Sequence, residues 1–176
     1  RHPGIERVLE LYNDGDRGPS LVYEGDFAAI SLEEYMDGRD PLRPSELADV
    51  LGMFSEAVAH CHTRSVVHRA LSPESLYISS GDHGTSVEIR RWVSASAGPQ
   101  GTQHFNENGA KFSAYRAPEL IHDPAIAAPS VDVFSLGCLT YFLATGEHPP
   151  ASDSGRVRVT SKGIDAHNQL RHFPPE

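Results

Sequence analysis

The chain has 176 residues, of which 39% are apolar, and this size and composition fit one globular domain of roughly 100 to 200 residues. Its 15 basic and 24 acidic residues give a net charge of −9, and no basic run occurs, which disfavours binding to nucleic acid or an anionic membrane. Neither an apolar run long enough to span a membrane nor a signal-peptide pattern is visible in these 176 residues. Both cysteines, Cys61 and Cys138, lie in apolar helical patterns, so we expect buried thiols and a reducing, cytoplasmic location.

The first half of the chain predicts hairpins around one long helix. Residues 5–12 and 20–24 are apolar runs on either side of a turn-rich segment, so they predict a β-hairpin. Apolar residues recur at helical spacing over 44–62 and predict an amphipathic helix that starts near Arg43 or Ser45. Short strands are expected at 66–67 and 76–78, and a turn at 81–84 pairs the second of them with 86–89.

The second half predicts a loop, a core helix and a polar end. Residues 94–113 are rich in Ser, Gly, Ala, Gln and Asn without periodicity, so we expect an exposed loop. Residues 131–145 are apolar on nearly every side and predict a helix at the centre of the core. A short final helix is expected over 164–173.

Three motifs follow one another at characteristic places. Residues 68–74 read His-Arg-Ala-Leu-Ser-Pro-Glu, residues 117–119 read Ala-Pro-Glu, and residues 132–137 read Asp-Val-Phe-Ser-Leu-Gly. In this order, and most clearly over about residues 44–150, they resemble the C-terminal lobe of the eukaryotic-type serine/threonine protein kinases.

That resemblance implies a mainly α-helical fold with small β-hairpins. Residues 1–26 would be the last N-lobe strands and the hinge, and residues 27–150 the kinase-like C-lobe. Residues 151–176 would be a polar tail or the start of the last C-lobe helices. Most of the N-lobe, including its glycine-rich loop, would lie outside this chain, which begins with Arg1 instead of Met and therefore suggests a piece of a larger protein.

The resemblance also implies that the catalytic positions are degenerate. Ala70 stands at the position of the catalytic aspartate, Ser72 at that of a phosphate-contacting lysine, and Ser75 at that of a metal-binding asparagine. Residues 91–93, Arg-Trp-Val, match the Asp-Phe-Gly motif, so Arg91 replaces the metal-binding carboxylate. A methyl group cannot accept a proton, and a hydroxyl is a weak ligand for Mg²⁺. We therefore expect no intact catalytic group and no metal site.

Other family positions keep structural residues. The resemblance places His68 and Trp92 in a buried hydrophobic column, and it matches Arg69 to the arginine that can pair with a phosphate in the loop at 94–113. Asp132 would hold the backbone of the catalytic loop. Glu119 would pair with an arginine beyond residue 176.

The nucleotide pocket is represented by four residues. By resemblance, Tyr23 gates the back of the pocket, Glu24 lies at the hinge, and Tyr77 and Leu139 belong to the column beneath the adenine ring. Tyr77 could stack on adenine, but we favour the interpretation that its ring fills the pocket itself. The sequence thus leaves ATP binding open and disfavours Mg²⁺.

Basic and metal-binding residue types leave further alternatives. Arg69 could pair with a phosphorylated Ser94, Ser96 or Thr102, against the simpler case of hydrogen bonds to the loop. Arg90 or Arg91 could clamp nucleotide phosphates, against a solvated basic pair. Zinc binding by residues 60–62, His-Cys-His, is disfavoured because residues two apart on a helix face different sides.

These observations predict a pseudokinase module that works by binding, scaffolding or allostery. Its partner would be another domain of the parent protein or a separate protein, and Leu139, Phe142 or Phe173 would lack cover and mark the contact. One rival is a divergent ATP-dependent serine/threonine kinase or another kinase-fold transferase. The other is a purely structural segment whose pocket is plugged by Tyr77 and Trp92.

Overall fold

In the computed structural model, the described residues are 1–15, 18–26, 28–81, 84–98 and 113–150. Helices and strands both contribute to the architecture, where the sequence predicted a mainly α-helical chain. The elements in chain order are β1 (Arg7–Asp14), β2 (Gly18–Glu24), β3 (Ile30–Ser31), α1 (Leu32–Met36), α2 (Pro44–His62), β4 (Val66–Val67), β5 (Leu76–Gly81), β6 (Gly84–Ile89), β7 (Ser96–Ala97), α4 (Glu119–His122) and α5 (Pro129–Thr145). Single 3-10 turns occur at Trp92–Ser94 and Ser113–Tyr115.

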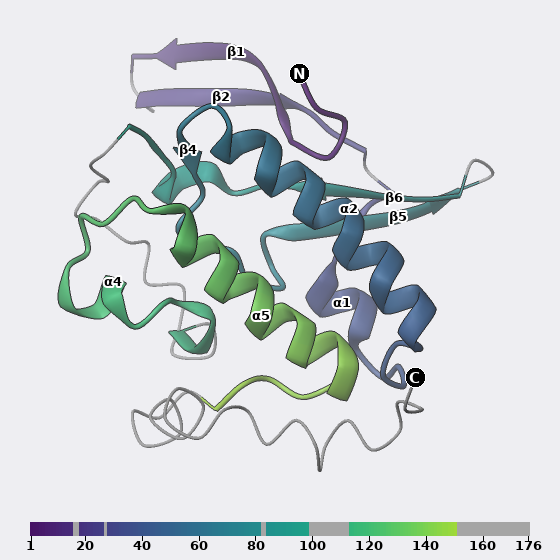
Figure 1. Ribbon diagram of the computed structural model, residues 1–176. Helices are drawn as coiled ribbons and strands as arrows, with labels where there is room; N and C mark the ends of the chain where they lie inside the picture. Colours follow the sequence, from purple (N-terminus) through teal and green to yellow (C-terminus); the bar gives the residue numbers. More distant parts are fainter. Residues whose placement is uncertain (16–17, 27, 82–83, 99–112, 151–176) are drawn as a thin grey trace.

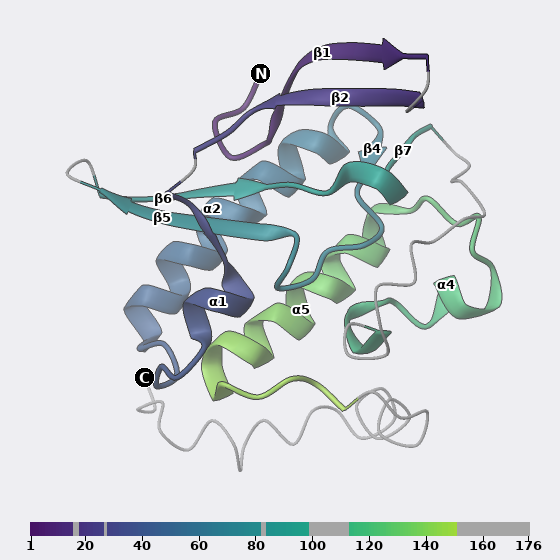
Figure 2. The same ribbon diagram turned by 180° about the vertical axis from the view of Figure 1, so that it is seen from behind.

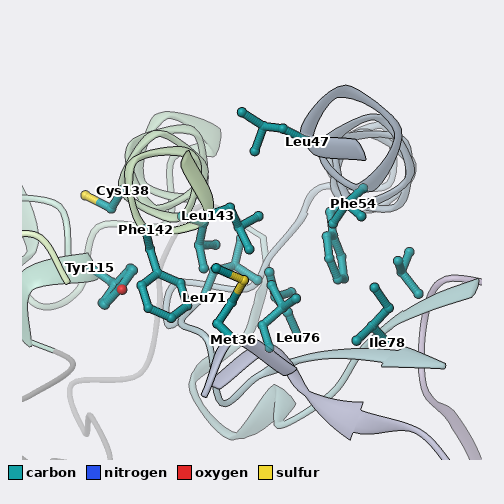
Figure 3. Close-up of a cluster of buried hydrophobic side chains, with 14 of the residues drawn as sticks. Met36, Leu47, Phe54, Leu71, Leu76, Ile78, Tyr115, Cys138, Phe142 and Leu143 are labelled. Carbon is teal, nitrogen blue, oxygen red and sulfur yellow. The ribbon is translucent and has the colours of Figure 1, made fainter. Parts of the chain in front are cut away.

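Two long helices and one hairpin enclose the core. Helices α2 and α5 lie side by side and run in opposite directions, with the β5–β6 hairpin across them (Figures 1 and 2). Figure 3 shows Phe54 of α2 and Phe142 and Leu143 of α5 directed toward the side on which Leu76 and Ile78 of β5 lie. The apolar faces of all three elements are therefore buried against one another, which is the main stabilising contribution expected for a domain of this size.

The boundaries of α2 follow from local sequence. Pro44 occupies the first helical position, where its missing N–H removes no hydrogen bond. The backbone N–H of Arg43 donates to the Glu46 carboxylate at 3.1 Å, and the two side chains form an ion pair at 2.8 Å. The predicted helix over 44–62 is confirmed, with Arg43 as its N-cap residue.

Both predicted hairpins are confirmed. Strands β1 and β2 pair in antiparallel fashion, and β5 pairs with β6 from Leu76↔Ile89 to Gly81↔Gly84. The β1–β2 hairpin lies apart from the core at the top of the molecule in Figure 1, and many of its apolar side chains are exposed. It is joined to the end of β6 by a parallel bridge between Ile5 and Ile89.

The segment predicted as an exposed loop contains ordered, buried structure. Ser96 and Ala97 form β7, which pairs with β4, and the side chains of Ser94 and Ser96 are buried. A two-residue strand of Ser and Ala carries no periodic signal, because its pairing depends on a distant partner. Residues 99–112 of this loop, with Thr102, lie outside the described residues.

The predictions for α5 were partly wrong. Val133 is 59% exposed, so the helix is not buried on every side. Leu139 and Phe142 do not lack cover: both are buried, and the ring of His148 stacks on Phe142 with centroids 4.7 Å apart. The predicted helix over 164–173, including Phe173, lies outside the described residues.

Both cysteines are buried free thiols, as predicted. In the described part of the chain, no helix is both long and apolar enough to cross a membrane.

Candidate functional site

The start of the loop at residues 68–75 is held on its buried side by one carboxylate. Asp132, buried near the start of α5, accepts hydrogen bonds from the backbone N–H groups of His68 at 2.9 Å and Arg69 at 2.7 Å. The same carboxylate contacts Nε2 of His62 at 2.9 Å. A buried carboxylate is costly unless it is paired or hydrogen-bonded, and these contacts satisfy both of its oxygens. This is the backbone-holding role that the sequence assigned to Asp132.

His68 is a buried, neutral link between the loop and the end of β6. Burial lowers the pKa of His68, although the Arg90 carbonyl and Asp132 act in the opposite direction. Nε2 lies 3.0 Å from the Arg90 carbonyl oxygen, and the Ala70 backbone N–H lies 3.3 Å from Nδ1. The neutral tautomer that carries its proton on Nε2 satisfies both contacts, so His68 is placed as a structural group.

Trp92 packs against His68, as expected for the column to which the sequence assigned them. The two ring centroids are 4.6 Å apart in an edge-on arrangement, and the indole Nε1 donates to the Ile89 carbonyl at 3.0 Å. Trp92 therefore packs, partly buried, against the core beneath the loop.

Arg69 is one of the most deeply buried side chains, with 1% of its surface exposed. Its guanidinium donates to the carbonyl oxygens of Ile126 and Ser94, each at 3.0 Å, and to that of Pro124. Arg69 also has a left-handed backbone, with φ of 68°, a conformation that is costly for a residue with a Cβ atom. The hydrogen bond to Ser94 is a contact with the loop at 94–113, which the sequence offered as the alternative to a phosphate partner, whereas Pro124 and Ile126 lie beyond that loop.

Two of the degenerate positions, Ser72 and Ser75, are hydrogen-bonded to each other within the loop. Ala70 is exposed, whereas Ser75 is buried, and its hydroxyl both accepts from the Ser72 backbone N–H and donates to the Ser72 carbonyl, each at 2.9 Å. The Ser75 oxygen is therefore committed to the loop.

Arg91 occupies the position expected for the metal-binding carboxylate, and it carries its own counter-ion. Its backbone is left-handed, with φ of 64°, and its guanidinium forms an ion pair with Glu74. A cation paired in this way opposes binding of Mg²⁺, which prefers anionic oxygen ligands. The residues at this site therefore do not fit the metal ion that the family resemblance implies.

Arg90 packs on Tyr77, the residue that the family resemblance placed beneath an adenine ring. The Arg90 guanidinium lies over the ring of Tyr77, 4.1 Å from its centroid. Arg90 also pairs with Glu88 at 2.7 Å and donates to the backbone carbonyl of Asp26 at 3.2 Å. With the side chains of Arg90 and Glu88 only 16% and 20% exposed, the prediction of a solvated basic pair is wrong for Arg90.

Tyr77 lines a groove and does not fill it. The groove has a volume of about 320 Å³ and extends from the segment after β2 across β5, β6 and α2. Asp26, Tyr77 and Glu88, the partners of Arg90, are all among its lining residues. The Tyr77 ring and two other contacts of Arg90 thus border open space, although Arg90 is not itself a lining residue of this groove.

The remaining predicted residues are dispersed. Tyr23 and Glu24 lie at the end of β2, where Glu24 pairs with Arg7 at 2.9 Å, and burial together with Glu6 raises the pKa of Tyr23. Leu139 is buried inside the core. Glu119 begins α4, and within the described ranges its carboxylate makes no ion pair.

The zinc alternative gains no support from the contacts of its residues. His62 is engaged by Asp132, and the ring of His60 lies 4.9 Å from that of His2. Among the described residues, no three His, Cys, Asp or Glu side chains are grouped so that they could hold a metal ion.

Comparison with known proteins places this geometry in a family. The family model described as a protein kinase domain matches residues 1–173. The carbon catabolite-derepressing protein kinase of Saccharomyces cerevisiae is 28% identical over 93% of this chain and 24% of its own length. The serine/threonine-protein kinase PrkC of Bacillus subtilis is 26% identical over 94% of the chain and 24% of its own length.

A human relative shows the same pattern of coverage. The serine/threonine-protein kinase/endoribonuclease IRE2 of Homo sapiens is 31% identical over 88% of the chain and 17% of its own length. The chain thus spans about a quarter or less of the length of these curated relatives.

Proposed function

The chain belongs to the protein kinase family, and from that premise we propose that it is a kinase domain that does not transfer phosphate and that acts by binding, scaffolding or allostery within a larger protein. The observation that carries the proposal is the pairing of Arg91 with Glu74 at the position where the family holds its metal ion. Because Ala70 also lacks a proton acceptor, both the base and the metal ligands are missing.

The carboxylates beside the loop support the same conclusion. Glu74 pairs with Arg91 and Glu88 with Arg90, so each is already neutralised by a guanidinium. Positioning alone retains some rate in damaged active sites, but loss of the groups that stabilise the transition state costs on the order of 10⁴-fold or more. The residues that hold the loop in shape, led by Asp132, would then serve binding and not turnover.

A protein surface is the partner that we propose, either another domain of the same protein or a separate protein in the cytoplasm. The β1–β2 hairpin exposes several apolar side chains on one small unit: Val8, Leu9, Leu11, Leu21 and Val22. A cluster of this kind supports contact with another protein surface. The net charge of −9 supports neither nucleic acid nor an anionic membrane as the partner.

A divergent ATP-dependent serine/threonine kinase is the second candidate. It is favoured by the names of the relatives, which are serine/threonine kinases at 26% to 31% identity. In such an enzyme Glu88 or Arg90 would need a new catalytic role, which their ion pair with each other opposes.

A phosphotransfer assay on the intact protein separates the two candidates. With labelled ATP and either Mg²⁺ or Mn²⁺, we expect no incorporation into the protein or a generic substrate, and none after Ala70→Asp, because the metal ligands are still absent. An active kinase in the same buffers is the positive control. Incorporation by the wild-type protein that disappears in Glu88→Gln would contradict the proposal, and appreciable activity of Ala70→Asp would contradict the diagnosis of several defects.

A further inference from the structure

Arg90 makes three contacts that join the nucleotide-facing parts of the site. It covers the ring of Tyr77, pairs with Glu88 of β6 and donates to the carbonyl of Asp26, which follows β2. We propose that Arg90 is a built-in occupant of the adenine-facing site, so that a purine can bind only after this side chain is displaced. The inference rests on the proposed function and deepens it, because it concerns what the same site binds.

The stacking contact is the first reason. The guanidinium is a flat, delocalised cation, and at 4.1 Å from the Tyr77 centroid it lies at stacking distance from the aromatic face. A purine that stacked on this face would need the same space, since two planar groups cannot both lie against it. Arg90 and adenine therefore exclude each other on this face of the ring.

The contact with the segment after β2 is the second reason. A planar base is oriented in a pocket by a few polar groups, often from the backbone. The carbonyl of Asp26 is such a group, and it already accepts from Nη2 of Arg90 at 3.2 Å. Arg90 thus combines a stacked plane with a backbone hydrogen bond, the two kinds of contact that a purine would make.

The ion pair with Glu88 fixes Arg90 in this position. Both side chains are about four-fifths buried, so the 2.7 Å contact is less screened than a surface pair. Glu6 also interacts electrostatically with this pair. Burial raises the pKa of Glu6, Arg90 lowers it and Glu88 raises it. Arg90 therefore balances acidic groups, and its removal would leave a site that is acidic and repels a triphosphate.

This charge balance decides which ligand should be used as the probe. Adenosine carries the base without phosphates. Its affinity therefore reports stacking on Tyr77 without any attraction or repulsion between phosphates and the charged side chains. A phosphate clamp by Arg90, the alternative that the sequence left open, makes a different prediction for this ligand: because adenosine has no phosphates, the Arg90→Ala protein would bind it as the wild type does.

The test is calorimetric titration of the intact protein with adenosine, and with ATP in the presence and absence of Mg²⁺. If the open form is a minor population, Arg90→Ala should tighten adenosine binding by on the order of tenfold, because apparent affinity scales with the fraction of open sites. Arg39→Ala is the matched control. Its guanidinium also lies 4.1 Å from a tyrosine ring, that of Tyr35, but at the end of α1, so adenosine affinity should equal that of the wild type.

The outcomes separate cleanly. Equal adenosine affinity in the wild type and Arg90→Ala, including no binding by either, would overturn the proposal. Tighter binding of adenosine together with weaker binding of ATP by Arg90→Ala would support it, since the substitution leaves the acidic groups unbalanced. Should the alanine variant fail to fold, Arg90→Met keeps the apolar stem and removes the stacked cation, and the same gain is expected from it. Phosphotransfer by the wild-type protein would instead refute the proposed function, which this titration does not measure.

Discussion

The buried side of the loop at residues 68–75 and its open side are built from different kinds of contact. On the buried side, the side chains of Asp132 and Arg69, each only 1% exposed, hold backbone groups through hydrogen bonds. On the open side, Arg91 pairs with Glu74, and Arg90 covers Tyr77. The loop keeps the scaffold that gives a kinase its shape, while the groups that would meet a substrate are bound to one another. The contacts that keep the shape of this loop are therefore separate from the groups that would carry out catalysis beside it.

The largest loss of stability is expected from Asp132→Ala, which removes the main contact on the buried side of the loop. The substitution leaves the N–H groups of His68 and Arg69 buried without their acceptor, and each such group costs about 1–3 kcal/mol. The free energy of unfolding should fall by about 2–5 kcal/mol, and the melting temperature by on the order of 10 °C. The exposed carboxylate variant Asp37→Ala is the control. An unchanged melting temperature of Asp132→Ala would show that the buried side does not depend on this residue.

A somewhat smaller effect is expected from Arg69→Met, which keeps the apolar stem but removes the guanidinium. Carbonyl groups of Ile126, Ser94 and Pro124 lose a charged donor, so we expect a loss of about 2–3 kcal/mol in chemical denaturation. The loss should appear in unphosphorylated protein. Should the variant match the wild type until the protein is phosphorylated, Arg69 would be a phosphate partner and not a structural group.

The smallest effect concerns pH and sharpens the role of His68. Burial lowers the pKa of His68 in the folded protein below the ordinary value of about 6.5. Below that pH the unfolded chain therefore binds the proton more readily than the folded protein does. The stability that neutral His68 contributes is complete above that pH and is lost as the pH falls toward the folded pKa, by about 1.4 kcal/mol for each unit of the shift.

The midpoints of urea denaturation at pH 7.5 and 5.5 measure this pH-dependent part of the stability. His68→Leu should reduce the fall in stability between the two values, whereas the exposed His122→Asn should leave the fall unchanged. An equal fall in His68→Leu and the wild type would exclude His68 as its source.

The sequence predicted those parts of the fold that depend on neighbours along the chain. The helix over 44–62 has both an apolar period and Pro44 at its start, and the strand pair at 76–89 has a turn between its strands. The pairing of β7 with β4 was missed because two residues of Ser and Ala carry no pattern and the partner lies about 30 residues away. Cover for Phe142 was missed for a different reason: His148 is close in the sequence, but it stacks on Phe142 only because the chain turns back at Gly146, the left-handed C-cap of α5.

The candidate site was predictable in identity but not in contacts. Family resemblance located Ala70, Ser75 and Arg91, yet it could not tell that the Ser75 hydroxyl closes the loop or that Arg91 has Glu74 beside it. One usable signal was overlooked. Glu88 and Arg90 are two residues apart at the end of a strand, and side chains at that spacing point to the same face, so their ion pair could have been anticipated.

A single carbonyl oxygen, that of Ile89, accepts both the backbone N–H of Glu6 and the indole N–H of Trp92, each at 3.0 Å. The strand that leads into the outer hairpin and the ring beneath the catalytic loop thus share one acceptor. The outer hairpin is therefore connected to the ring that packs on His68 through a single backbone atom, and this connection involves no nucleotide.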